Sequence, residues 1–152
     1  MKLHQFALIL PVLFFFTACQ TDDETCRETT LVQVRIGLYT QGTTTAAPVD
    51  SITVKSIEND SVYYNNTKKI SKIALALDHS SDLQRYAIRF NNQWDTLTLI
   101  YNSEPYFVSY ACGMIYIHQL DTVLTTNHVV TDIRIQDHLI TTADAQHIQI
   151  YR

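Results

Sequence analysis

Hydrophobic and polar residues alternate with a period of two along most of the chain. The alternation is clearest at 31–38, where valine, isoleucine and leucine are separated by polar or small residues. It recurs at 52–54, 62–64, 72–77, 86–90, 97–101, 106–109, 114–119, 129–135 and 147–151. Such alternation predicts strands with one buried face. Turn-forming residues separate several of these segments, at 59–60, 65–66, 80–82, 91–92 and 102–103.

The spacing of these segments predicts the fold class. No stretch after the first 18 residues repeats its apolar positions every 3.6 residues, as a helix would. Eight or nine short strands at roughly ten-residue spacing favour an all-β fold. We expect a single antiparallel β-sandwich, Ig-like or jelly-roll-like, over residues 30–152, with a closed barrel as the alternative.

The N-terminal residues have the pattern of an export signal. Lys2 precedes an apolar run at 6–16, which is too short to span a bilayer and lacks a basic cluster behind it. The sequence FTAC at 16–19 resembles a bacterial lipobox. The resemblance implies that residues 1–18 are a lipoprotein signal peptide. It also implies that Cys19 carries diacylglycerol and a fatty acid such as palmitate. A lipid anchor would tether the protein to a membrane. The alternative is an ordinary signal peptide that is cut nearby.

Acidic residues follow the lipobox cysteine directly. Asp22, Asp23 and Glu24 resemble the surface-export signal of lipoproteins in Bacteroidota, which implies an outer-membrane protein at the cell surface. The alternative is a solvated spacer in a protein kept on the periplasmic face. In either case residues 19–29 form the lipidated cysteine and its acidic tether.

Two cysteines remain once Cys19 is lipidated. Cys26 precedes the first strand, and Cys112 is followed by Gly113, which permits a tight turn. Disulfides persist outside the cytoplasm, so we expect a bond between Cys26 and Cys112. The alternative is a pair of buried free thiols.

Several strand starts and turns together resemble a known group of proteins. They are 50–54 (DSITV), 60–65 (DSVYYN), 72–75 (KIAL), 95–99 (DTLTL), 107–109 (FVS) and the Cys-Gly pair at 112–113. This succession is similar to a family of small Bacteroidota lipoproteins with no assigned function. The resemblance implies an envelope location and a β fold, and it carries no catalytic residue to this chain.

The charged and catalytic residue types do not assemble into a motif. A net charge of −4 and the lack of a basic cluster argue against nucleic acid as a partner. The histidines after the signal peptide do not show metal-ligand spacing, and the sequence has neither a nucleophile elbow nor a phosphate-binding glycine loop. We therefore expect no metal, no cofactor and no catalytic residue.

Aromatic residues suggest a binding surface instead. The candidates are Trp94, Tyr106, Tyr110, Tyr116 and His118. We expect Tyr106 and Tyr110 to share one side of their strand with Tyr116 nearby, and His118 to face solvent beside Tyr116, since Ile115 and Ile117 are expected to face the core. Such a strip suits a glycan or an envelope protein, although tyrosine also fills sandwich faces. Trp94 either caps the core or is displayed.

Four tripeptides resemble the Asp-Ser/Thr-apolar acceptor of the O-glycosylation system of Bacteroidota. The acceptor residues are Ser51, Ser61, Thr96 and Thr122. The alternative is that Asp and Ser/Thr begin strands because they are turn residues.

These patterns favour a lipid-anchored envelope protein that acts as a non-enzymatic binding or structural accessory module at the outer membrane. The alternative is a hydrolase that acts on envelope or dietary glycans. A deep cleft with convergent carboxylates or histidines would favour the hydrolase, and exposed tyrosines on a flat face would favour the module.

Overall fold

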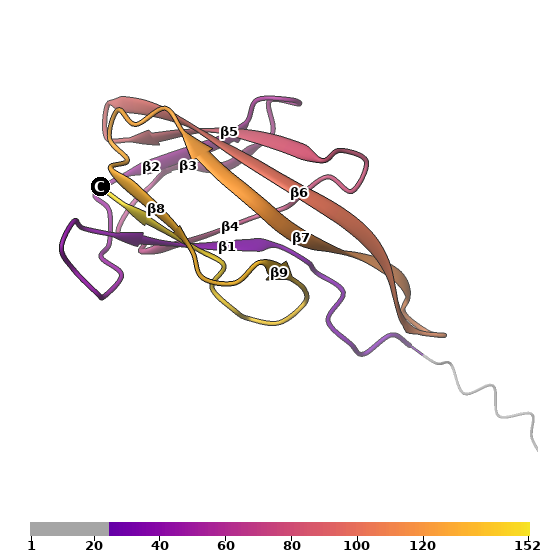
Figure 1. The fold of residues 1–152 in the computed structure, drawn as a ribbon. Helices are drawn as coiled ribbons and strands as arrows, with labels where there is room; N and C mark the ends of the chain where they lie inside the picture. The colour runs from indigo at the N-terminus through magenta and orange to yellow at the C-terminus, as the bar shows by residue number, and fades with distance from the viewer. Residues whose placement is uncertain (1–24) are drawn as a thin grey trace, which may run out of the picture.

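A computed structural model describes residues 25–152, which form two facing β-sheets (Figure 1). The strands are β1 (Val34–Tyr39), β2 (Ile52–Ser56), β3 (Val62–Thr67), β4 (Lys72–Leu75), β5 (Leu83–Phe90), β6 (Gln93–Ser109), β7 (Gly113–Thr125), β8 (Asp132–Ile135), β9 (Leu139–Ile140) and β10 (Ile148–Tyr151). No helix occurs among these described residues. The predicted all-β sandwich is therefore confirmed. The predicted signal peptide, Cys19 and the acidic residues at 22–24 lie outside the described residues.

The two sheets differ in size. One has the strand order β4-β1-β10-β8, and the other has the order β3-β2-β5-β6-β7-β9. In Figure 1 the larger sheet forms the upper layer and the smaller sheet the lower layer. One pairing departs from the expected antiparallel pattern, because β1 runs parallel to β10.

The core lies between the sheets and is built from the apolar half of each alternating strand. Strands β1, β4 and β10 contribute Val34, Ile36, Leu38, Ile73, Leu75, Ile148 and Ile150. The larger sheet contributes Ile52, Val54, Tyr86, Ile88, Leu97, Leu99, Tyr101 and Leu120. Two of these tyrosines also hold a loop, because Tyr86 donates a hydrogen bond to the carbonyl of Ala76 and Tyr101 donates one to that of Asp78.

Strand β6 is longer than the sequence predicts. The predicted turn at Asn102 and Ser103 is wrong, because both residues continue the ladder, opposite Gln119 and His118 respectively. The hydroxyl of Ser103 also has a partner within the sheet, the Nδ1 atom of His118 at 2.9 Å. Turn-forming residues are thus accommodated in a strand when their polar groups are satisfied. Residues 102–119 of β6 and β7 form a hairpin, here called the hairpin arm, that extends past one end of the sandwich (Figure 1).

Two expectations near the C-terminus also need correction. The predicted strand at 129–135 begins only at Asp132, because the preceding residues form a loop held by the carboxylate of Asp95. The short strand β9 has no counterpart among the predicted elements. It pairs with β7 through only two residue pairs, which is too little sequence to produce a recognisable alternation.

The predicted disulfide is present. The Cα atoms of Cys26 and Cys112 are 4.7 Å apart, within the range that a disulfide spans, and the sulfur atoms are bonded. Gly113 beside it has a φ of 72°, which suits the turn between β6 and β7. The alternative of two free thiols is wrong. The bond holds the tip of the hairpin arm against the beginning of the described chain, which runs alongside the arm in Figure 1.

Candidate functional site

The predicted aromatic surface is divided between the two faces of the hairpin arm. Residues directly opposite in an antiparallel ladder share a face. Tyr116 is opposite Pro105, whereas Tyr106 is opposite Ile115, one position along, so Tyr106 and Tyr116 point to opposite sides. Tyr110 lies beyond the end of β6, in the turn. The expected common strip of tyrosines is therefore wrong, and each face of the arm carries its own aromatic residue.

His118 is buried rather than solvent-facing, so this prediction is also wrong. Only 3% of the residue is exposed, because His118 lies on the same face as Leu120 and Tyr101, which are buried in the core. The ring of Tyr101 packs edge-on against the imidazole, with 5.4 Å between ring centroids. Burial, together with the nearby charge of His79, lowers the pKa of the imidazole. His118 is therefore neutral at pH 7 and forms part of the packing.

The contact between Ser103 and His118 resembles two members of a hydrolytic triad. A triad also needs a carboxylate that orients the imidazole. Within the described residues, the only side-chain hydrogen bond of His118 is the one to Ser103. Ser103 also lies in the middle of a continuous strand rather than at a sharp strand-to-helix turn. The pair therefore does not have the geometry of a nucleophile and its base.

Trp94 is displayed at the other end of β6. Its exposed fraction is 42%. The guanidinium of Arg89 lies 5.3 Å and the ammonium of Lys55 5.9 Å from the ring centroid, both within cation–π range. Fifteen positions separate Trp94 from Ser109 along one strand, which corresponds to about 50 Å at the usual rise per residue. The tryptophan therefore cannot act together with the tyrosines of the hairpin arm.

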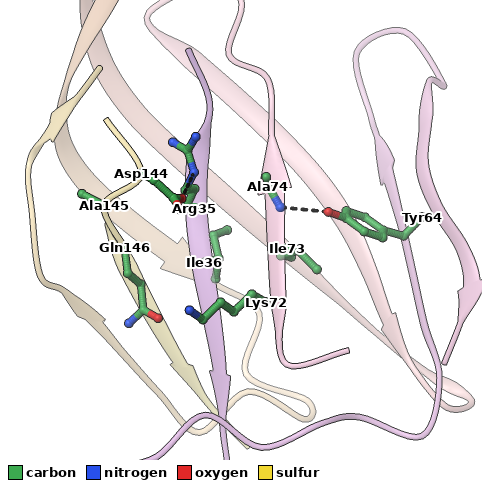
Figure 2. Close-up of a pocket in the computed structure, with 9 residues that line it drawn as sticks. All are labelled: Arg35, Ile36, Tyr64, Lys72, Ile73, Ala74, Asp144, Ala145 and Gln146. Atoms are coloured by element: carbon green, nitrogen blue, oxygen red, sulfur yellow. Dashed lines mark hydrogen bonds and ion pairs between the residues drawn. The ribbon is translucent and has the colours of Figure 1, made fainter. Parts of the chain in front are cut away.

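A groove of about 250 Å³ lies on the smaller sheet (Figure 2). It is lined by Arg35, Ile36, Tyr64, Lys72, Ile73, Ala74, Asp144, Ala145 and Gln146. Arg35 Nε is 2.9 Å from a carboxylate oxygen of Asp144, and the Arg35 guanidinium also donates to the carbonyl of Ala143. Lys72 forms no ion pair with any described residue. The groove thus contains an ion pair and one additional cation.

Two local features fix side chains that line the groove. Gly37 allows the side chain of Gln146 to approach the sheet, because a Cβ atom at this position would lie 2.4 Å from Gln146 Oε1. The Gln146 amide is held there by donating to the hydroxyl of Tyr39 at 3.0 Å. At the other side, Tyr64 accepts a hydrogen bond from the backbone N–H of Ala74 at 2.9 Å, which satisfies an amide of edge strand β4. No sequence motif predicts this groove.

Asp95 has a structural role that the neighbouring residues in the sequence do not indicate. Only 2% of the residue is exposed, and its carboxylate accepts hydrogen bonds from the N–H groups of His128, Val129 and Val130 at 2.7–2.9 Å. The hydroxyl of Thr126 donates to the same carboxylate at 2.8 Å. Burial raises the pKa of Asp95, but these hydrogen bonds outweigh it, so the pKa lies below its usual range. The carboxylate is therefore an anion that fixes a loop.

The four predicted O-glycosylation residues differ in accessibility. Ser61 is exposed in the turn before β3, whereas Ser51, Thr96 and Thr122 are partly covered. The role of Asp95 accounts for the aspartate that precedes Thr96 without reference to a sugar. Glycosylation at any of the four stays a prediction.

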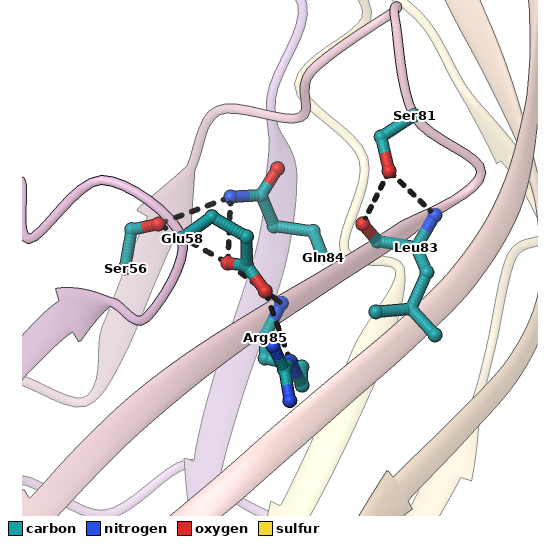
Figure 3. A network of polar contacts seen from close by, with 6 residues as sticks. All are labelled: Ser56, Glu58, Ser81, Leu83, Gln84 and Arg85. Atoms are coloured by element: carbon teal, nitrogen blue, oxygen red, sulfur yellow. Dashed lines mark hydrogen bonds and ion pairs between the residues drawn. The ribbon is translucent and has the colours of Figure 1, made fainter.

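A second polar cluster, shown in Figure 3, connects the turn after β2 to β5. Glu58 accepts from the backbone N–H and side chain of Arg85 at 3.0–3.2 Å, and the buried amide of Gln84 donates to Ser56 and Glu58. Nearby, Ser81 and Leu83 close a turn through the serine hydroxyl. Burial raises the pKa of Glu58, but the hydrogen bonds from Arg85 and Ser56 lower it by more than burial raises it. The pKa of Glu58 therefore lies below its usual value. These groups satisfy one another, which makes the cluster a structural element.

Among residues 25–152, no three His, Cys, Asp or Glu side chains are arranged to hold a metal ion. The same part of the chain has no helix with the length and apolar character needed to cross a membrane.

The chain matches a protein-family model. No curated protein and no solved structure matches the chain. A family model described as a family of unknown function, DUF6452, matches residues 51–152, which are 102 of the 152 residues. The matched region includes β2 to β10 and most of the segments on which the sequence resemblance rests. The chain therefore belongs to the DUF6452 family of unknown function.

Proposed function

We propose that the protein is a lipid-anchored, non-enzymatic binding module of the cell envelope, held at the outer membrane through Cys19. The acidic residues Asp22, Asp23 and Glu24 direct it to the cell surface in this proposal. Residues 1–18 are removed on export, and the sandwich stands on the short tether that follows Cys19.

The observation that carries the proposal is the disulfide between Cys26 and Cys112. Disulfides persist in oxidising compartments outside the cytoplasm and are rare inside it. The bond therefore supports the export that the N-terminal residues predict. It also supports the assignment of Cys19 as the lipidated residue, because the chain has three cysteines and the other two are bonded to each other.

The groove on the smaller sheet is the surface that best suits a ligand. Arg35 and Asp144 offer a donor and an acceptor side by side, and Lys72 adds an ammonium group that forms no ion pair within residues 25–152. Sugars are recognised by a few well-placed polar groups of this kind, and the net charge of these three side chains is +1. We therefore propose an acidic envelope glycan, such as a polymer of uronic acids, as the ligand.

Replacing Lys72 with glutamine tests this assignment. We expect the Lys72→Gln variant to bind oligogalacturonate about tenfold more weakly than the wild-type protein, because one charge-assisted hydrogen bond is lost. Lys68→Gln is the matched control, since Lys68 is an exposed lysine that does not line the groove. Isothermal titration calorimetry measures both. Equal affinities for wild type and Lys72→Gln would reject the groove as the site.

Replacing Cys19 with serine tests the anchor. A serine cannot form the thioether to diacylglycerol, so the Cys19→Ser variant should leave the membrane pellet and lose label from radioactive palmitate. The Cys26→Ser/Cys112→Ser double variant is the control, because it should keep the label. Labelled Cys19→Ser protein in the membrane pellet would contradict the proposed anchor.

A further inference from the structure

The tip of the hairpin arm is apolar on both faces. From Pro105 to Leu120 the chain contains no Asp, Glu, Lys or Arg. One face of the arm carries Leu120, His118, Tyr116 and Met114. Side-chain exposure on this face increases toward the tip, from fully buried Leu120 to Met114, which is 56% exposed. Phe107 lies opposite Met114 on this face, and Tyr106 is exposed on the other. Tyr110 at the turn is 94% exposed and contacts Phe107 edge to face.

The disulfide fixes where this tip lies along the molecule. Cys26 is bonded to Cys112, in the turn of the hairpin. Cys19 precedes Cys26 by seven residues, and seven residues of fully extended chain span at most about 25 Å. An acyl group on Cys19 therefore holds the tip within that distance of the membrane surface, whatever path the tether takes.

We propose that the tip of the hairpin arm inserts as far as the boundary between headgroups and acyl chains of the membrane that carries the Cys19 anchor. This inference rests on the proposed lipid anchor. The lipid surface becomes a second attachment point for the protein, through Phe107, Tyr110 and Met114.

The distribution of side chains distinguishes a lipid surface from a protein partner. A protein that packs on one face of a two-stranded arm leaves the other face in water. Here both faces and the turn expose apolar or aromatic groups, and a lipid surface surrounds all three. Tyrosine is favoured at membrane interfaces because its ring is apolar and its hydroxyl remains hydrated.

Insertion sets the orientation of the whole sandwich. The C-terminus and the turn between β5 and β6 lie at the end opposite the arm (Figure 1). Trp94, next to that turn, is about 50 Å along β6 from the tip, at the usual rise per residue. The tip is therefore the membrane-proximal end, and Trp94 faces the medium.

Tryptophan quenching by brominated lipid tests the proposal. Trp94 is the single tryptophan of the chain, so wild type reports on the distal end. The Trp94→Phe/Tyr110→Trp variant reports on the tip, and position 110 is exposed enough to accept the change without loss of fold. Both acylated full-length proteins are reconstituted into liposomes of phosphatidylethanolamine and phosphatidylglycerol, with and without brominated acyl chains. Flotation of the liposomes first shows that each protein is anchored.

We expect brominated lipid to remove most of the emission of the tip variant and to leave the emission of wild type unchanged. Anchored protein whose tip variant is not quenched overturns the insertion while the lipid anchor stands. A blue-shifted but unquenched tip points to a protein contact and also overturns it. Quenching at both positions overturns the upright orientation, and protein that does not float overturns the anchor and the insertion together.

Discussion

Replacing Asp95 with alanine should lower the free energy of unfolding by about 3 kcal/mol or more, the largest loss we expect from a single substitution. The change leaves the backbone N–H groups of His128, Val129 and Val130 without their acceptor. Unpaired buried donors cost about 1–3 kcal/mol each, and partial hydration of the loop recovers some of the sum. Urea unfolding at pH 7 measures the effect. A loss below about 0.5 kcal/mol, typical of surface changes, would contradict the role assigned to Asp95.

The same carboxylate makes stability depend on pH. The pKa of Asp95 is lower in the folded protein than the ~3.9 of an unfolded chain, because hydrogen bonds outweigh burial. A depressed pKa contributes stability above the unfolded pKa, and this contribution is lost as the pH falls through the folded pKa. Asp95→Asn should therefore lose less stability than wild type when the pH falls from 6 to 3. The matched control is Asp121→Asn, at an exposed aspartate, which should follow the wild-type curve.

Removing the disulfide should have an effect of similar size. The Cys26→Ser/Cys112→Ser variant loses a constraint across a sequence separation of 86 residues, which the chain-entropy model values at about 4 kcal/mol. The double variant avoids a lone reactive thiol. Urea unfolding of the variant should match that of wild-type protein unfolded in a reductant. Equal stability of the oxidised protein and the variant would show that the bond does not constrain the unfolded chain.

Alternation along the chain was sufficient to predict the fold class because one face of most strands is buried against the other sheet. In β1, for example, Val34, Ile36 and Leu38 enter the core, as their period of two predicts. The rule fails where a strand leaves the sandwich. Toward the tip of the hairpin arm both faces carry exposed side chains, Met114 on one and Tyr106 on the other, so Ile115 and Ile117 do not mark an inward side.

An irregularity in β7 explains the error at His118. Leu120 pairs with Tyr101 and Thr122 pairs with Ile100, so Asp121 is an extra residue between them. Because of this extra residue, the alternation of side chains shifts by one position at Asp121. Even-numbered Leu120 and His118 therefore lie on the same face of the sheet as odd-numbered Val123. Nothing in the residue pattern around Asp121 indicates the bulge.

The disulfide could be predicted from the sequence, whereas the groove could not. The pairing of Cys26 with Cys112 was predictable because the predicted lipidation of Cys19 leaves two cysteines, and the predicted export places them in an oxidising compartment. The groove was not predictable, because Arg35, Lys72 and Asp144 come from distant segments that only the smaller sheet and its neighbouring loop bring together. Gly37 was the one residue whose type pointed to this region, since a glycine within a strand often marks a place where another group approaches the backbone closely.

The central claim is that the mature protein begins at a lipidated Cys19. Its most direct test is mass spectrometry of the N-terminal tryptic peptide, which ends at Arg27, from protein purified out of native membranes and reduced. We predict a peptide that starts at Cys19 and carries a diacylglyceryl group on its sulfur and an acyl group on its amine. A peptide that starts at another residue, or that contains an unmodified Cys19, would contradict the account.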